Sequence, residues 1–200
     1  MRGGLAVPGA RALDAAIAEV LIDEPTLQAR VHTLGAEITA RYADGPAPVL
    51  VGVIKGVTFF MADLVRAIDL PVEMDFLAIS RYGPHARGSR AAVSVLYDLT
   101  TPITGRPVVL VEDVIDTGLP VAFLLRMLHA RQPASLEVCA LLDRQSVRLI
   151  DIPLTYVGFR IPDRFVVGYG LDYQEKYRNL PYIGVLRPEQ AQDGARPLAG

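Results

Sequence analysis

The chain has 200 residues, a length that suits one α/β domain with a hydrophobic core and is short for two. Its formal net charge of −2 leaves no basic footprint for nucleic acid, and its single cysteine excludes an internal disulfide. No segment reaches the roughly 18 apolar residues of a membrane span. We therefore expect one cytoplasmic domain that binds neither nucleic acid nor a membrane.

Residues 1 to about 17 are rich in Gly and Ala, and we expect them to form a loose arm or a weak helix. Asp23 can then cap a helix that has Pro25 in its first turn and extends to about Tyr42. Apolar residues recur at helical spacing along this segment: Leu27, Val31, Leu34 and Ile38. This pattern predicts a helix that packs on the core.

The rest of the chain alternates between apolar strands and helices. The predicted strands cover residues 48–54, 72–80, 91–99, 108–111, 136–142, 154–159 and 165–167, and the predicted helices cover residues 58–68 and 121–131. Strands 72–80 and 91–99 are expected to form a hairpin with a long tip over residues 81–90. The alternation predicts an α/β fold with a mostly parallel sheet flanked by helices.

The strand at 108–111 is followed by an acidic loop. Glu112, Asp113 and Asp116 come first, and Thr117-Gly118 then opens the next helix. Ligands of parallel sheets bind outside the carboxyl ends of the strands, and helix N-termini attract anions. A phosphorylated sugar fits this loop, because its hydroxyls can donate to the carboxylates while its phosphate meets the helix end and Mg²⁺ bridges the charges. This order of residues favours such a site over a solvated strand end with an ordinary helix cap.

The run VEDVIDTG at residues 111–118 resembles the phosphoribosyl pyrophosphate motif of type I phosphoribosyltransferases. Further segments resemble the hypoxanthine(-guanine) subfamily: VIKG at 53–56, FMADL at 60–64, MDF at 74–76, YVGF at 156–159, FVVGYGLDY at 165–173 and YRNL at 177–180. The resemblance implies one domain over residues 18–187 with a small base-binding hood, a flexible arm at 1–17 and a flexible tail at 188–200. It also implies a homodimer or homotetramer.

The reaction implied by the resemblance is Mg²⁺-dependent purine salvage. Phosphoribosyl pyrophosphate and a 6-oxopurine, hypoxanthine or guanine, would give the nucleoside 5′-monophosphate and pyrophosphate. Asp116 would exchange a proton with N7 of the base, and Lys55 and Arg178 would neutralise the leaving pyrophosphate. In the family the peptide bond before this lysine can be cis. The residues implied to bind phosphoribosyl pyrophosphate are Lys55, Gly56, Glu112, Asp113, Asp116, Thr117, Gly118, Leu119, Pro120 and Arg178.

The resemblance also implies a base site and a lid. Phe165 would stack on the purine and the Val166 backbone would read its edge. Glu112 and Asp113 would be ligands of Mg²⁺, and Asp172 would help to hold a second Mg²⁺. Phe165 could instead be a core aromatic, and Asp172 a solvated loop carboxylate. The lid implied over the active site includes Arg81 and Tyr82, although Tyr82 could equally be a surface tyrosine.

Three positions depart from the family pattern. Arg81 replaces the serine of the lid, and Pro120 replaces the threonine that usually ends the anion loop, which removes a hydroxyl and an N–H. Arg144 replaces the lysine that contacts the exocyclic oxygen of the purine, and its planar fork is no equivalent of an ammonium group. Two alternatives therefore stay open: an enzyme of the same fold that uses another or a modified base, and a regulatory module that binds phosphoribosyl pyrophosphate with little turnover.

Overall fold

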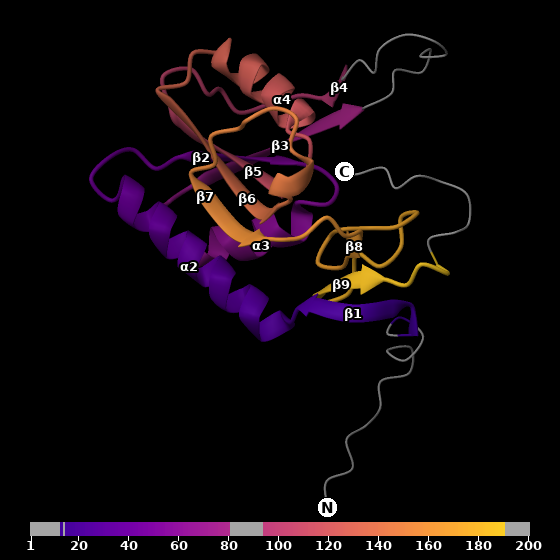
Figure 1. Ribbon diagram of the computed structural model, residues 1–200. Coiled ribbons are helices and arrows are strands. Elements are labelled where there is room, and N and C mark those ends of the chain that lie inside the picture. Colours follow the sequence, from indigo (N-terminus) through magenta and orange to yellow (C-terminus); the bar gives the residue numbers. More distant parts are fainter. Residues whose placement is uncertain (1–12, 14, 81–93, 191–200) are drawn as a thin grey trace, which may run out of the picture.

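The computed structural model describes residue 13 and residues 15–80 and 94–190, and the protein folds into two sheets with helices on both faces of the larger one (Figure 1). The elements in chain order are β1 (Ile17–Ile22), α2 (Glu24–Tyr42), β2 (Val49–Val53), α3 (Thr58–Ala67), β3 (Glu73–Ser80), β4 (Ser94–Tyr97), β5 (Pro107–Ile115), α4 (Leu119–His129), β6 (Ser135–Asp143), a 3₁₀ turn (Gln145–Val147), β7 (Tyr156–Arg160), β8 (Val166–Val167) and β9 (Ile183–Leu186).

The larger sheet has the strand order β4-β3-β2-β5-β6-β7, and every neighbouring pair in it is parallel except β3 with β4. Alternate residues of its central strands are buried on opposite faces, as the two-residue period of a strand requires. Val109 and Val111 of β5 pack with α2 and α3, whereas Val108 and Leu110 pack with α4. The mostly parallel, helix-covered sheet predicted from the sequence is confirmed, as is the antiparallel β3–β4 pair.

The strand order places a crevice between β2 and β5. From β2 the chain passes through α3 to β3 on one side, whereas from β5 it passes through α4 to β6 on the other. The loops that leave the carboxyl ends of β2 and β5 therefore diverge. Such a reversal of strand order is where α/β sheets bind ligands.

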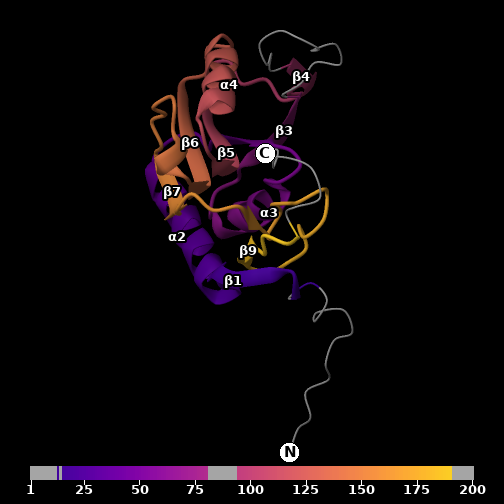
Figure 2. The same cartoon turned by 45° about the vertical axis from the view of Figure 1, so that its right-hand side comes forward.

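A second, three-stranded antiparallel sheet has the order β1-β9-β8 and lies beside the N-terminal end of α2 (Figures 1 and 2). Neither β1 nor β9 was predicted as a strand. Their pairing joins residues far apart in the chain, such as Ile22 with Ile183, so no local pattern announces it. The predicted arm at 1–17 overlaps the start of β1, where Ala16 and Ile17 are buried. Most of that arm lies outside the described residues, as does the predicted tail from 191 onward.

Several predicted boundaries were wrong. Strand β5 extends four residues beyond 111, because its ladder with β6 continues to the pair Ile115 and Asp143. Helix α4 begins at Leu119, two residues before the predicted start, and β7 begins at Tyr156. Residue 165 precedes β8. The first of these errors matters for function, because it places Glu112 and Asp113 inside the strand.

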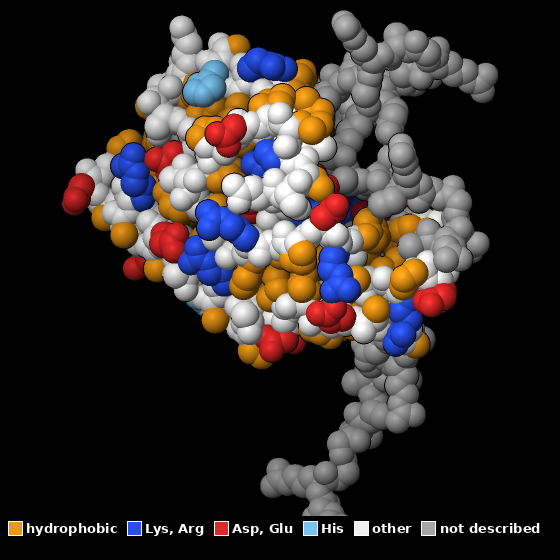
Figure 3. Space-filling model, viewed as in Figure 1, with side chains coloured by type: hydrophobic (Ala, Val, Ile, Leu, Met, Phe, Trp, Pro, Cys, Tyr) orange, Lys and Arg blue, Asp and Glu red, His pale blue; other side chains and the backbone are white. Residues whose placement is uncertain are grey.

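Helix α2 begins as predicted. The Asp23 side chain accepts a hydrogen bond from the Thr26 amide at 2.9 Å, which satisfies one free N–H of the first turn. Within the described residues, no helix combines the length and the apolar character needed to cross a membrane. On the face shown in Figure 3, cationic and anionic side chains are interspersed, and neither sign gathers into one patch.

Candidate active site

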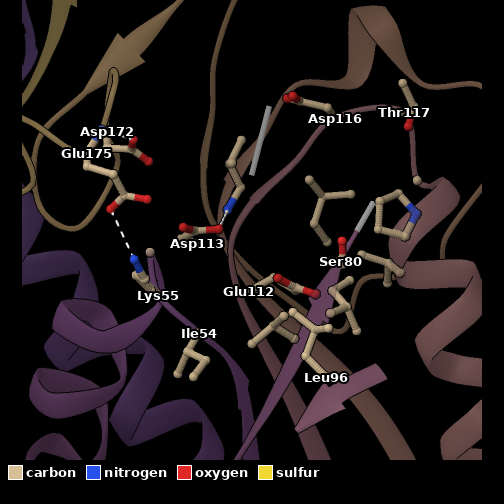
Figure 4. Close-up of a pocket in the computed structure, with 18 residues that line it drawn as sticks. Ile54, Lys55, Ser80, Leu96, Glu112, Asp113, Asp116, Thr117, Asp172 and Glu175 are labelled. Carbon is tan, nitrogen blue, oxygen red and sulfur yellow. Dashed lines mark hydrogen bonds and ion pairs between the residues drawn. The ribbon is translucent and has the colours of Figure 1, made fainter. Parts of the chain in front are cut away.

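A cavity of about 430 Å³ opens at the crevice between β2 and β5, a size within the usual range of small-molecule sites (Figure 4). Its lining residues come from four parts of the chain: Val53, Ile54, Lys55 and Gly56; Ile79, Ser80 and Leu96; Glu112, Asp113, Val114, Ile115, Asp116, Thr117, Gly118, Pro120 and Val121; and Asp172 and Glu175. We call the part from residues 112–121 the β5 wall. The part formed by Lys55, Gly56, Asp172 and Glu175 is called the β2 wall.

The carboxylates of the β5 wall are held close to the protein. Glu112 and Asp113 are each 7% exposed. Asp113 Oδ1 accepts a hydrogen bond from the Val114 amide at 2.7 Å. The Asp116 side chain is 12% exposed and accepts a hydrogen bond from Arg144 Nη1 at 3.0 Å. The structure thus brings the three acidic residues singled out in the sequence into one cavity.

The turn after Asp116 has the geometry of an anion loop. Gly118 adopts φ of +80°, a left-handed conformation that suits glycine, and α4 starts at the next residue. The Leu119 amide is 3.4 Å from Thr117 Oγ1. Pro120 lies in the first turn of α4, where its missing N–H does not interrupt the helix but cannot serve an anion either. Thr117, Gly118 and Pro120 line the cavity, whereas Leu119 is exposed outside it.

On the β2 wall, the peptide bond between Ile54 and Lys55 is cis, as the resemblance implied. The Lys55 carbonyl accepts a hydrogen bond from Thr58 Oγ1 at 2.7 Å, which ties the loop to the start of α3. A Cβ at Gly56 would lie 1.7 Å from Asp113 Oδ2. Only glycine therefore allows this loop to approach the β5 wall so closely.

Glu175 links the two cations that the resemblance assigned to pyrophosphate. Its Oε2 atom lies 3.3 Å from Lys55 Nζ and 3.1 Å from Arg178 Nη2, and Figure 4 shows the first of these pairs across the cavity. Both cations hold the pKa of the Glu175 carboxyl below its usual value, with Arg178 the stronger influence. Arg178 also forms an ion pair with Asp172 at 2.8 Å. Arg178 does not itself line the cavity, but both of its acidic partners, Asp172 and Glu175, do.

Sequence reasoning missed Glu175. The available signal was its spacing, because it lies three residues after Asp172 and three residues before Arg178, in a segment where Gln174 and Glu175 both have positive φ. A tight turn of this kind can gather all three side chains. Neither the turn nor the contact with Lys55, 120 residues away, can be read from local sequence.

Arg144 does not line the cavity but touches the β5 wall from outside. Its guanidinium bridges Asp116 and Asp163, and its Nε atom is buried without a hydrogen-bond partner. The side chain of Arg144 is 15% exposed and that of Asp163 is 59% exposed. Arg144, which was predicted to contact the purine, is thus bonded to Asp116, which was predicted to exchange a proton with the purine. The role of Asp163 was not foreseen.

The other predicted base-site residues belong to the smaller sheet and its flanking loop. Val166 pairs with Val185 in the ladder of β8 with β9 and is buried. Phe165 packs edge-on against Tyr173, with ring centroids 5.7 Å apart. Neither residue lines the cavity described above. Arg81 and Tyr82, the predicted lid, lie outside the described residues.

The loop that carries Asp172 is held against helix α3 by Tyr169. The Tyr169 hydroxyl donates to Asp63 Oδ2 of α3 at 2.6 Å, and burial raises the pKa of this phenol. A Cβ at Gly170 would lie 2.0 Å from the Gly56 carbonyl oxygen, so these two glycines permit contact between the two loops of the β2 wall. The contact between Tyr169 and Asp63, 106 residues apart, was not predicted.

The acidic residues of the cavity are of the kind that binds Mg²⁺ together with a phosphorylated substrate. Within the described part of the chain, no three His, Cys, Asp or Glu side chains are arranged to hold a metal by themselves. Protein sites for Mg²⁺ on phosphorylated substrates commonly supply one or two carboxylates and leave the other positions to phosphate and water oxygens. Glu112, Asp113 and Asp172 offer oxygens of that kind around the cavity.

Comparison with known proteins agrees with this geometry. A family model described as the phosphoribosyl transferase domain matches residues 19–174. The hypoxanthine-guanine phosphoribosyltransferase of Bacillus subtilis (strain 168) is 48% identical over 172 residues, which is 86% of this chain and 94% of that protein. The chain belongs to the phosphoribosyltransferase family.

Other members of the family support a closer placement. The hypoxanthine phosphoribosyltransferase of Salmonella typhimurium is 47% identical over 167 residues, 83% of this chain and 93% of that protein. A crystal structure of a hypoxanthine phosphoribosyltransferase from Staphylococcus aureus superposes with a TM-score of 0.85 at 41% identity, covering 91% of this chain and 98% of that one. Within the family, the chain thus falls among the hypoxanthine(-guanine) phosphoribosyltransferases.

Proposed function

We propose that the protein transfers the phosphoribosyl group of phosphoribosyl pyrophosphate to a 6-oxopurine, hypoxanthine or guanine, and releases pyrophosphate and the nucleoside 5′-monophosphate. The observation that carries this proposal is the single cavity that combines the acidic residues and anion loop of the β5 wall with Lys55 of the β2 wall. The choice of hypoxanthine or guanine as the base rests on the names of the relatives given above. Substrate breadth, the cytoplasmic location and a homodimeric or homotetrameric state belong to the same proposal.

In this reaction the β5 wall holds the sugar phosphate. Glu112 and Asp113 accept hydrogen bonds from the ribose hydroxyls, while Thr117, Gly118 and the amide of Leu119 bind the 5′-phosphate. Pro120 contributes no donor. Asp116 exchanges a proton with N7 of the base, and the guanidinium of Arg144 at 3.0 Å holds its carboxylate in place.

The β2 wall receives the leaving group. Lys55 and Arg178 neutralise the pyrophosphate charge as the bond to the ribose breaks, with the Gly56 loop in contact. Glu112 and Asp113 would hold Mg²⁺ and Asp172 would help to hold a second Mg²⁺, and these ions would neutralise charge on the phosphate oxygens. Phe165 and Val166 contact the base, and the lid that the resemblance assigns to Arg81 and Tyr82 lies outside the described residues.

A second candidate function is transfer to another or a modified base. It is favoured by Arg144, because carboxylates engage both terminal nitrogens of its guanidinium, so a substituent of the base has to compete with them. A panel of hypoxanthine, guanine, xanthine, adenine and several non-purine bases separates the two candidates. Pyrophosphate release is measured with Mg²⁺ and phosphoribosyl pyrophosphate, and the variant Asp116→Asn serves as the blank.

We expect release with hypoxanthine or guanine. Release with another base alone would establish the second candidate. Binding of phosphoribosyl pyrophosphate without release for any base would instead identify a regulatory module and refute the transferase proposal.

A further inference from the structure

The loop between β5 and α4 rests on a second segment, residues 144–150, which passes behind it. Three successive carbonyls, those of residues 115, 116 and 117, accept hydrogen bonds from this one segment. The donors are Arg144 N to Ile115 O at 3.0 Å, Arg148 Nε to Asp116 O at 2.9 Å, and Leu149 N and Ile150 N to Thr117 O at 3.0 and 3.1 Å.

These bonds determine which way the amides of the loop point. In a planar trans peptide the N–H lies opposite the C=O, so carbonyls turned toward the segment 144–150 leave the N–H groups of residues 116–118 turned away from it. Thr117 and Gly118 line the cavity and no residue of the segment 144–150 does, so the cavity lies on the opposite side of the loop. The segment 144–150 therefore orients the loop so that the amides of residues 116–118 face an anion in the cavity.

Arg148 is the only side chain among these donors, and it is firmly held. Its side chain is 10% exposed and forms an ion pair with Asp143, which is 6% exposed. Its Nη2 atom also lies 3.4 Å from the Ile115 carbonyl oxygen. A Cβ at Gly118 would lie 3.0 Å from Arg148 Cδ, so the loop packs directly on this side chain.

We propose that Arg148 is a positioning residue for phosphoribosyl transfer, an inference that rests on the function proposed above. It acts by fixing the carbonyls of residues 115 and 116, which sets both the Asp116 carboxylate and the amides that bind the 5′-phosphate. Asp143 in turn fixes Arg148. A misplacement of about 1 Å in such a loop can lower a rate about 100-fold.

The test replaces Arg148 in two ways and compares the variants with a matched control. Arg148→Met keeps a long side chain without donors, and Arg148→Lys keeps the charge without the planar fork. The control is Arg160→Met, because Arg160 approaches the same Asp143 at 3.8 Å but is 74% exposed. Three quantities are measured for each protein: kcat, KM for phosphoribosyl pyrophosphate, and the inhibition constant of pyrophosphate, with the melting temperature alongside.

We expect Arg148→Met to raise KM for phosphoribosyl pyrophosphate at least about tenfold and to lower kcat/KM about 100-fold. Arg148→Lys should recover part of this loss, and Arg160→Met should match the parent. The inhibition constant of pyrophosphate should stay within about twofold, because pyrophosphate binds the β2 wall. A merely structural role would weaken both ligands together.

Unchanged KM and kcat in a folded Arg148→Met variant would overturn the proposal, as would equal weakening of both ligands. If Arg148→Met does not fold, the same comparison is made with Arg148→Lys: a raised KM for phosphoribosyl pyrophosphate with an unchanged inhibition constant of pyrophosphate supports the proposal, and equal weakening of both ligands overturns it. If the parent shows no turnover with any base, the proposed function fails. The inference is then tested by direct titration of phosphoribosyl pyrophosphate and of pyrophosphate into the parent and both variants, with selective loss of the first ligand as the supporting result.

Discussion

The two walls of the cavity differ in how their charges are held. On the β5 wall, Asp116 is 12% exposed, its carboxylate meets Arg144 and its carbonyl meets Arg148. On the β2 wall, Lys55 and Glu175 are 68% and 65% exposed and meet only through an ion pair at the cavity. A part-buried charge with several partners is costly to move, whereas an exposed ion pair contributes only about 0–1 kcal/mol and is easily exchanged.

This contrast fits the two halves of the proposed reaction. The sugar phosphate and the base must be placed accurately for the proton transfer at N7, which suits the restrained β5 wall. Pyrophosphate must arrive with the substrate and leave after transfer. On the β2 wall, the Glu175 carboxylate is paired with Lys55 and Arg178, the cations that pyrophosphate would contact. Pyrophosphate would therefore bind by replacing this carboxylate as their partner.

The largest effect is expected from Asp116→Asn. The amide cannot take a proton from the base, so kcat should fall about 10²- to 10⁴-fold. Binding of phosphoribosyl pyrophosphate should change only a few-fold, because the anion loop remains. The matched control is Asp163→Asn, which removes the other, 59% exposed, partner of Arg144. Equal losses of rate and binding in Asp116→Asn would contradict a role in proton transfer and weaken the contrast between the walls.

A large effect is also expected where the walls touch, in Gly56→Ala. The new methyl group would lie 1.7 Å from Asp113 Oδ2, and Asp113 is buried, so its carboxylate has little room to turn. We expect KM for phosphoribosyl pyrophosphate to rise at least about tenfold. Gly45→Ala is the control, because a Cβ there has no neighbour within 4 Å. An unaltered KM would contradict this expectation, because it would mean that the Asp113 carboxylate can move away from the added methyl group.

A gain of affinity is expected from Pro120→Thr. The substitution restores a hydroxyl and an N–H at the start of α4, and one added hydrogen bond to a bound phosphate should tighten phosphoribosyl pyrophosphate about two- to tenfold. Pro120→Ala restores the N–H alone and should give an intermediate value. Isothermal titration in the presence of Mg²⁺ measures all three proteins. An unchanged dissociation constant would show that the remaining donors of the loop suffice.

The smallest effect is expected from Glu175→Gln on the β2 wall. Removing the exposed anion from Lys55 and Arg178 should tighten pyrophosphate by no more than about fivefold, the equivalent of an exposed ion pair. Glu73→Gln is the control, since Glu73 pairs with Arg106 at 2.6 Å away from the cavity. Weaker pyrophosphate binding in Glu175→Gln would show that Glu175 supports the site and does not compete for it.

Much of this arrangement was open to prediction from sequence because it is local. Buried parallel strands form continuous apolar runs, and the acidic loop follows one of them directly, so the fold class and the carboxylates of the β5 wall were accessible. The long-range parts were not. The pairing of β1 with β9, the contact of Glu175 with Lys55, and the bonds from Arg148 to residues 115 and 116 join segments with no shared local pattern.

The central claim is that this cavity joins a phosphoribosyl group to a purine. The most direct measurement is mass-spectrometric detection of the nucleoside 5′-monophosphate formed from phosphoribosyl pyrophosphate, Mg²⁺ and hypoxanthine or guanine, with Asp116→Asn run beside the parent. The account predicts product from the parent in equal amount to the pyrophosphate released, and at most a trace from Asp116→Asn. Absence of the nucleotide with both bases, in a protein that still binds phosphoribosyl pyrophosphate, would contradict it.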